Sequence, residues 1–296
     1  MNNFMWFSGV IEDIQDPSML NRVRARCFGF HTDDKTLIPT KDLPWATVMM
    51  PCTSSGMSGL GASPHGLYAG SWVFGFFKDG DSHQDPVIIG TMMALQGGMP
   101  DTSKGFSDVT GNYPKSDYLN RSDVNKLATG TDTISYTPDS IINEPASPYA
   151  AVYPNNKVIE SPAGHIIEMD DTPSAERIRI KHKSGTLVEI HPNGDMVTRN
   201  GNKWSVTTGN DKVHITGAMQ VNIDSDANIT VGGSTILTCA STTITGNLSV
   251  GGSIIAGTSI TAGTAISAGS TISAVGGITG ATIDSSNVSL DTHSHE

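Results

Sequence analysis

Two histidines near the end of the chain have the spacing of a metal-ligand pair. His293 and His295 are separated by one serine, and in an extended strand two such side chains point to the same side. Two imidazoles alone are a weak ligand set, and a polar disordered tail is the alternative interpretation. Three copies around a threefold axis would supply six imidazoles, an octahedral set that suits an Fe ion better than structural zinc, which takes four ligands.

Such a site needs an element that brings three chain ends together, and a repeat precedes the histidines. No charged residue occurs from Ala227 to Ile283, and no aromatic residue follows Trp204. Large aliphatic residues and glycines recur with a period of six. They are Leu248, Ile254, Ile260, Ile266, Ile272 and Ile278, with Gly251, Gly257, Gly263 and Gly269.

One large apolar residue per hexad is too little for a core made by a single chain. A lone chain would also leave long unpaired strand edges. Three chains wound about one axis would pair these edges and bury the isoleucines, at about 1.5–3 kcal/mol for each side chain. The alternative is the single-chain β-helix of hexapeptide acyltransferases. Its repeat would form a short stack here, without a histidine in the hexads to act as general base. We therefore expect an intertwined homotrimer.

The first 96 residues are expected to form a small closed barrel. In the segment Arg22–Phe28, apolar residues alternate with arginines, which is typical of a strand with one buried face. Several short strands without a helical period favour an OB-fold. Strands are predicted at Arg22–Phe28, Leu43–Pro51, Ser71–Phe77 and Pro86–Gly90.

A proline-rich connector and a β-meander are expected to follow. The connector, 97–157, is interpreted as a strap that lies on a partner or a neighbouring subunit, with a helical turn near Ser122–Leu127. The segments Arg177–His182 and Thr186–His191, with turns at Ser184-Gly185 and Asn193-Gly194, predict antiparallel strands.

Composition excludes several functions. The net charge of −11 argues against nucleic-acid binding and against docking on an anionic membrane. Cys27, Cys52 and Cys239 are scattered, which favours inert thiols over a disulfide framework or a zinc site. The N-terminus has no secretory signal pattern, and no apolar run is long enough to span a bilayer as a helix.

Two parts of the sequence resemble one known family. The N-terminal part resembles the OB domain of phage baseplate hub and spike proteins and of type VI secretion spikes. A later part resembles the start of the triple-stranded β-prism of the same spikes. The first match is carried by Asn21-Arg22-Val23-Arg24, Phe28-Gly29-Phe30-His31, Leu43-Pro44-Trp45-Ala46, Gly70-Ser71-Trp72-Val73 and Gln84–Gly90, and the second by Glu160–His165 and His182–Thr186.

The resemblance implies a structural central spike of a contractile tail and not an enzyme. Some phage spikes carry a lysozyme between barrel and prism, but the connector here is too short for one. The resemblance implies a homotrimer that is attached by its OB domain to a baseplate hub protein and that pierces the target cell envelope. It also implies an Fe ion, one per trimer, bound by His293 and His295. No nucleic acid and no small-molecule substrate are expected as partners. A tailocin or secretion system in place of a phage, and a trimeric fibre or adhesin, stay open.

The fold class expected is therefore all-β, with an OB-fold barrel, an extended connector and an intertwined triple-stranded β-prism or β-helix. The predicted parts are the OB-fold domain 1–96, the connector 97–157, the start of the β-prism 158–226, the trimeric β-helix 227–285 and the metal-binding tip 286–296.

Other residues with possible chemistry receive structural interpretations. Glu168, Asp170 and Asp171 could form a carboxylate pair for glycoside hydrolysis, but solvated acids beside a turn are the preferred interpretation. Arg22, Arg24 and Arg26 near Phe28 could bind an oligonucleotide, but an exposed strand face or a hub contact is preferred. The dispersed residues His165, His182, His191 and His214 are interpreted as surface or packing residues, and Met49-Met50 and Met92-Met93 as packing or contact surface.

Overall fold

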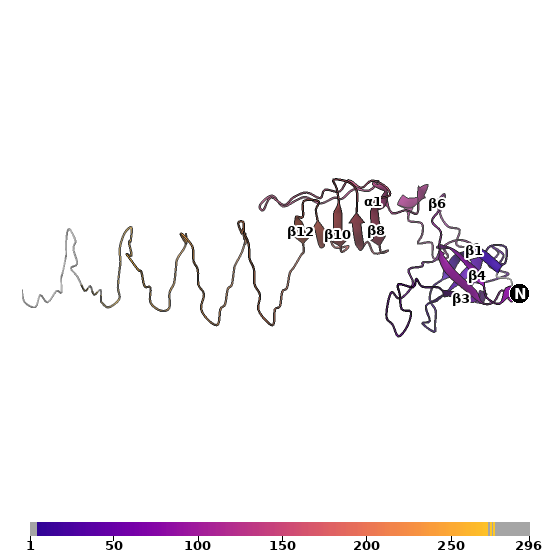
Figure 1. Ribbon diagram of the computed structural model, residues 1–296, viewed down its shortest axis with the longest axis horizontal. Coiled ribbons are helices and arrows are strands. Elements are labelled where there is room, and N and C mark those ends of the chain that lie inside the picture. The colour runs from indigo at the N-terminus through magenta and orange to yellow at the C-terminus, as the bar shows by residue number, and fades with distance from the viewer. Residues whose placement is uncertain (1–4, 272, 274, 276–296) are drawn as a thin grey trace, which may run out of the picture. The chain divides into compact units, whose positions relative to one another are not determined.

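The computed structural model describes residues 5–271, 273 and 275. The chain divides into two units, Met1–Asp224 and Ser225–Glu296. All strands and helices of the described residues lie in the first unit (Figure 1). Among the described residues, no helix has the length and apolar character needed to cross a membrane.

A closed five-stranded barrel occupies the N-terminal part of the first unit. Its neighbours follow the order β1-β2-β3-β5-β4; β3 and β5 are parallel and the other pairs are antiparallel. This arrangement confirms the OB-type barrel. The strands are β1 (Met5–Asp13), β2 (Arg22–Cys27), β3 (Trp45–Val48), β4 (Trp72–Phe77) and β5 (Pro86–Thr91), with 3₁₀ helices η1 (Thr40–Asp42) and η2 (Gly80–Ser82) between them.

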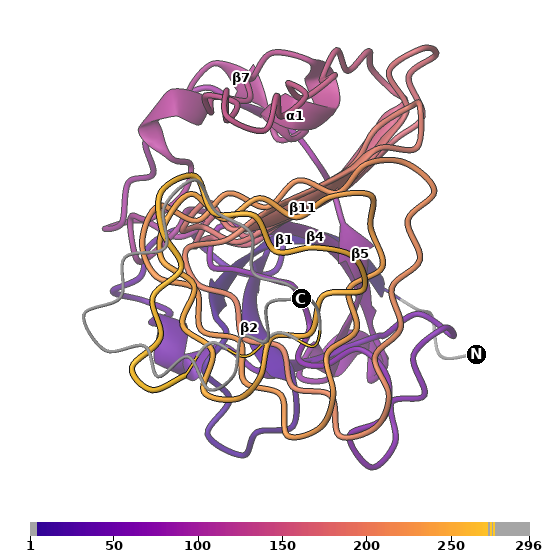
Figure 2. The same cartoon turned by 90° about the vertical axis from the view of Figure 1, so that its left-hand side faces the viewer.

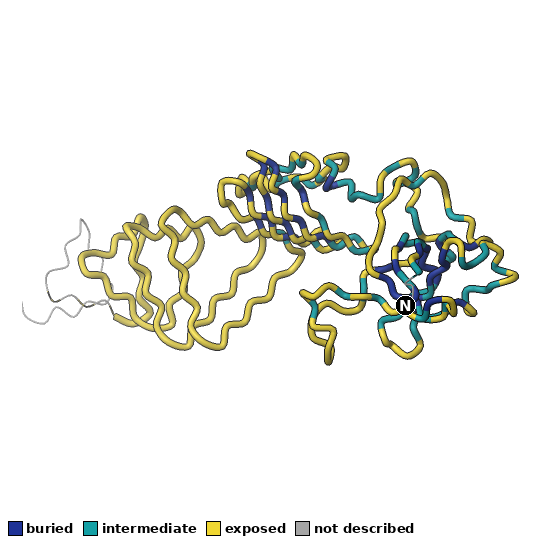
Figure 3. Tube along the Cα trace, turned by 45° about the vertical axis from the view of Figure 1, so that its right-hand side comes forward, coloured by how far each residue is buried: buried dark blue, intermediate teal, exposed yellow. Residues whose placement is uncertain are grey.

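The barrel core follows the period of two in its strands. On β2, Val23, Ala25 and Cys27 are all buried, as their alternation predicts. Gly75 on β4 is needed for close strand approach, because a Cβ there would lie 2.1 Å from the carbonyl oxygen of Val87. The core forms the dark cluster of the barrel in Figure 3. Strand β1 pairs with both β2 and β4 but was not among the predicted strands.

The connector contains little regular structure. Short strands β6 (Leu95–Gln96) and β7 (Arg121–Ser122) pair with each other, and η3 (Ser116–Tyr118) lies between them. Helix α1 (Lys126–Thr129) begins after Asn125, whose side chain accepts a hydrogen bond from the Leu127 amide. The helical turn therefore lies slightly later than predicted.

A second sheet of five antiparallel strands follows. The strands pair in chain order, which confirms the expected meander. Gly185 and Gly194 have φ values of +95° and +86° in the turns of two of its hairpins. The strands are β8 (Asn156–Glu160), β9 (Ile166–Asp170), β10 (Arg177–Lys181), β11 (Leu187–Ile190) and β12 (Met196–Arg199).

Residues 200–271 contain no helix or strand, and every residue in this range is exposed. We call 200–271 the open segment. Figure 2 shows it end-on, wound in successive wide turns. None of its described residues takes part in a backbone–backbone hydrogen bond. The predicted trimeric β-helix lies largely in this segment and stays a prediction, as do the predicted domain boundaries.

Candidate functional site

The five-stranded sheet buries its polar face and exposes its apolar face. On β9, Ile166, Glu168 and Asp170 are buried, whereas Ile167 and Met169, which alternate with them, are exposed. The same alternation runs along β10 and β11. The exposed apolar face consists of Ile159, Ile167, Met169, Ile178, Ile180, Val188, Ile190 and Met196. An apolar patch that spans a whole sheet is typical of an interaction surface.

A buried network of charges holds the opposite face together. Glu168 accepts a hydrogen bond of 2.7 Å from Arg177, and Arg179 lies 3.3 Å from Glu189 and 3.5 Å from Glu168. His191 lies 3.0 Å from the second oxygen of Glu189. The network joins β9, β10 and β11, and because its members are fully desolvated, removing one leaves another charge unpaired.

This network corrects the interpretation of the acidic residues as solvated. Glu168 and Asp170 are buried, and only Asp171 is exposed, where it pairs with Lys157 at 2.9 Å. The sequence could not show this, because the arginine partners of Glu168 lie on the next strand. Glu168 is engaged by two guanidinium groups and is not available as an acid or base for glycoside hydrolysis.

Residues 131–152, which we call the strap, lie on this polar face. The ring of Tyr149 lies 4.8 Å from the guanidinium carbon of Arg177, and Arg177 also donates to the Ser147 hydroxyl at 3.1 Å. Burial raises the pKa of Tyr149 to about 12. At the edge of the sheet formed by β12, Arg199 lies 3.6 Å from the Glu144 carboxylate. The strap therefore covers the sheet of its own chain, and the predicted contact of the connector 97–157 with a partner or a neighbouring subunit stays a prediction.

The arginines of β2 are bound within the barrel. Arg26 and Glu12 are both fully buried and 2.6 Å apart. Arg22 forms two hydrogen bonds with Asp16, which are the main cause of a lowered pKa of that carboxyl group. Arg24 donates to the carbonyl oxygens of Thr40, Lys41 and Leu43. The predicted exposed arginine face is wrong, because each guanidinium already has internal acceptors.

Aromatic side chains form two stacks on the barrel surface. Trp6 of β1 is 54% exposed and stacks on Phe74 of β4, with ring centres 5.3 Å apart. Phe28 stacks between Trp72 and Phe106, and Phe106 comes from the connector. The first stack is an exposed patch, whereas the second fastens the connector to the barrel.

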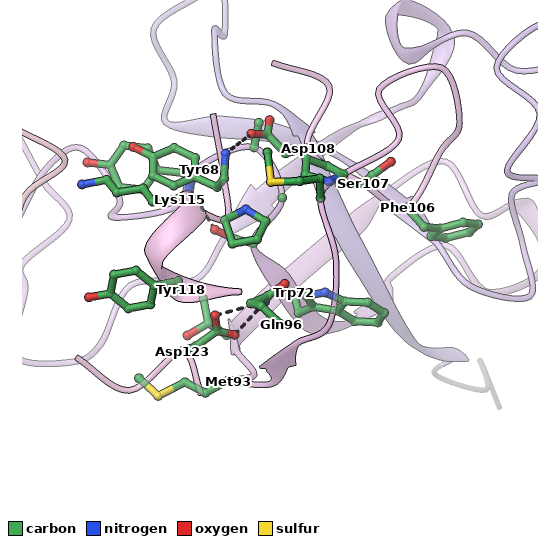
Figure 4. A pocket seen from close by; sticks show the side chains of 18 of the residues that line it. Tyr68, Trp72, Met93, Gln96, Phe106, Ser107, Asp108, Lys115, Tyr118 and Asp123 are labelled. Atoms are coloured by element: carbon green, nitrogen blue, oxygen red, sulfur yellow. Dashed lines mark hydrogen bonds between the residues drawn. The ribbon is translucent and has the colours of Figure 1, made fainter. Parts of the chain in front are cut away.

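A cavity of about 850 Å³ lies between the barrel and the connector. Tyr68, Trp72, Met93 and Tyr118 are among its lining residues (Figure 4). Gln96 donates to both oxygens of Asp123, at 3.0 and 3.1 Å. Among the described residues that line it, no side-chain nucleophile is hydrogen-bonded to a base. Met92 and Met93 line this space and are exposed, and the role of the methionines as packing or contact surface stays a prediction.

The predicted metal ligands His293 and His295 lie outside the described residues. Among the described residues, no cluster of three or more histidines, cysteines or acids could hold a metal ion. The rings of His165 and His182 lie 4.5 Å apart between centres and are tilted by 45°, although the sequence analysis treated these histidines as dispersed. Cys27 is buried, which raises its pKa to about 12, and Cys52 and Cys239 are exposed. All three thiols are free.

Comparison with known proteins identifies relatives of this chain. The family described as Gp5 N-terminal OB domain matches residues 29–175. Protein Gp5 of Vibrio phage KVP40 is 34% identical over 274 residues, which cover 77% of this chain and 65% of that protein. The pre-baseplate central spike protein Gp5 of Enterobacteria phage T4 is 34% identical over 186 residues, 60% of this chain and 31% of that protein. The chain therefore spans less than two thirds of the length of either relative.

Proposed function

Because this chain is similar to phage Gp5 proteins, and because residues 29–175 match the Gp5 N-terminal OB domain, we propose that it is the central spike of a phage tail baseplate. It is a structural protein of the virion. Its action is mechanical: a stiff trimer transmits the force of tail contraction to a small area of the target cell envelope. The barrel seats the spike on the hub at the end of the tail tube.

The main observation in favour of a trimer is the sheet β8–β12, which we call the inverted sheet because it buries charged side chains and exposes apolar ones. A sheet that buries Glu168 and Glu189 while it exposes Ile178 and Ile180 is costly for a chain alone in water. Three copies with these faces toward a common axis would remove the apolar side chains from water. Each fully buried aliphatic side chain contributes about 1.5–3 kcal/mol as an upper estimate.

The open segment supports the same assembly. Its isoleucines at the hexad positions Ile254, Ile260 and Ile266 are exposed in the single chain. Its backbone donors and acceptors form no backbone–backbone hydrogen bond with any other residue that the structure describes. Strand pairing between copies satisfies these groups and places the hexad side chains at the shared axis.

The proposed metal site near the end of the chain is the part of the proposal that rests on sequence alone. Three copies of the His293 and His295 pair bind one Fe ion through six imidazoles and lock the chain ends where the prism closes. The role proposed for this chain includes no catalytic step on a substrate.

Native mass spectrometry of the full, untagged chain tests the proposal. We expect a trimer with one iron per three chains, and loss of the iron without loss of the trimer in the His293→Ala/His295→Ala variant. A monomer overturns the spike. A wild-type trimer without metal overturns only the proposed metal site.

A further inference from the structure

We propose that a loop in the middle of the strap of each chain, which we call the tip, binds neighbouring copies of the same chain. The tip comprises residues 139–144, and its occupant is the open segment of a second copy. The inference rests on the proposed trimer but assigns a contact that the inverted sheet and the hexads do not provide.

The tip is held in one conformation before any partner arrives. The Glu144 amide donates to the Asp139 carbonyl oxygen at 2.8 Å, and the Asp139 amide donates to the Glu144 carboxylate at 2.7 Å. The Ile141 amide donates to the Asp139 carboxylate at 2.8 Å. Arg199 of β12 lies 3.6 Å from the same Glu144. These bonds close a small loop and fix it to the sheet, so little ordering entropy remains to oppose binding.

The loop presents its two apolar side chains to solvent. Ile141 and Ile142 are 58% and 55% exposed, although the rest of the tip is polar. A preorganised loop has no need of adjacent exposed isoleucines for its own stability, because its hydrogen bonds come from Asp139 and Glu144. Paired exposed aliphatic residues on a fixed loop are suited to a contact with another apolar surface.

The position of the tip beside Gln220 indicates that this apolar surface belongs to the open segment. The Gln220 side-chain amide donates to the Ile141 carbonyl oxygen at 3.3 Å, so the tip reaches past β12 to the open segment of its own chain. The loop beyond β12 is visible in Figure 1. Met219 and Val221, on either side of Gln220, are exposed.

In the trimer, the unpaired backbone around Gln220 pairs with the open segments of the other two copies. Paired strands lie about 4.7–4.9 Å apart. A tip that already contacts Gln220 is therefore one strand spacing from a neighbouring copy. The isoleucines of one chain then cover a strand of the next, and the strap acts as a clasp between subunits.

Site-specific photo-crosslinking in the full chain tests this contact directly. A benzophenone amino acid at position 142 should give covalent dimers and trimers on denaturing gels after irradiation. The matched control places the same group at Val152, another exposed residue of the strap. The Val152 amide donates a hydrogen bond to the Thr172 hydroxyl of its own chain. Only single-chain bands from position 142, in protein that native mass spectrometry shows to be trimeric, overturn the clasp. A monomer instead overturns the proposed spike.

A kinetic measurement provides the second test. We expect the Ile141→Ser/Ile142→Ser trimer to dissociate about tenfold faster or more in hot detergent than the wild type. Leu37→Ser, at an exposed apolar residue in a barrel loop, is the control and should leave the rate unchanged. An unchanged rate in the double variant contradicts the clasp.

Discussion

At the scale of single residues, the barrel contrasts a buried ion pair with an exposed one. Arg26 and Glu12 are fully buried, and Arg26 also donates to the carbonyl oxygens of Thr32 and Ile38. Lys78 and Asp85 are 2.9 Å apart with both side chains about half exposed. Desolvation makes the loss of one partner costly in the first pair, whereas solvent replaces the lost partner in the second.

We therefore predict that Arg26→Ala lowers the stability of the barrel by about 3–5 kcal/mol, because Glu12 is left as an unpaired buried charge. Lys78→Ala should change it by less than about 1 kcal/mol. Hydrogen exchange of barrel amides in the full chain measures both. Equal effects of the two substitutions would contradict the distinction.

The hydrogen bonds between Asp16 and Arg22 predict how the stability of the barrel depends on pH. Its hydrogen bonds with Arg22 lower its pKa from the ordinary value of 3.8. The stability that it contributes is therefore fully present above pH 3.8 and is lost as the pH falls toward the lower folded value. Asp16→Asn should lower the unfolding midpoint at pH 7, and the difference from wild type should shrink below pH 3.8. Asp42→Asn, at an exposed acid, is the control. If the difference in unfolding midpoint between Asp16→Asn and wild type stays constant across the acid range, the lowered pKa of Asp16 is not the source of the stability.

At the scale of elements, the inverted sheet separates folding from assembly. The buried network and the strap stabilise the sheet from one side, and the opposite apolar face is exposed and available for the proposed contacts with other copies. Substitutions on the apolar face should therefore affect assembly more than the fold of the chain.

We predict that Ile178→Asp/Ile180→Asp prevents trimer formation, because six charges would face a common apolar axis. The barrel signals in circular dichroism and hydrogen exchange should persist. Lys183→Asp, in the hairpin turn after β10, should still form trimers. Sedimentation velocity distinguishes the two, and a trimer of the double variant would place the interface elsewhere.

At the scale of the whole molecule, the two units are expected to contribute different kinds of stability. The barrel has its own core, whereas every described residue from 225 to 271 is exposed in the single chain. In the proposed trimer, the open segment would gain its stability only on assembly, because unwinding would require three chains to separate together.

Deletion of Ser225–Glu296 should therefore leave the unfolding midpoint of the barrel unchanged but make the trimer dissociate rapidly in detergent. Differential scanning calorimetry and gels of unheated samples measure the two quantities. If the truncated trimer resists detergent as well as the full chain does, the hexads are not the source of kinetic stability.

The sequence alone determined those features whose causes are local. Val23, Ala25 and Cys27 predict their strand because period two is a property of consecutive residues, and Gly185 and Gly194 predict their turns because these positions need a positive φ. The strand and turn patterns, together with the family resemblance, predicted the barrel and the meander, and the hexads predict an intertwined trimer.

Only the tertiary structure decided which charged side chains are buried. Glu12 on β1 is buried because Arg26, 14 residues later, neutralises it, and this long-range pair obscures the strand pattern of β1. Glu168 is buried for the same reason, because Arg177 and Arg179 come from the next strand and the strap excludes water. Burial of a charge depends on partners that meet only when the chain folds, so a local pattern cannot predict it.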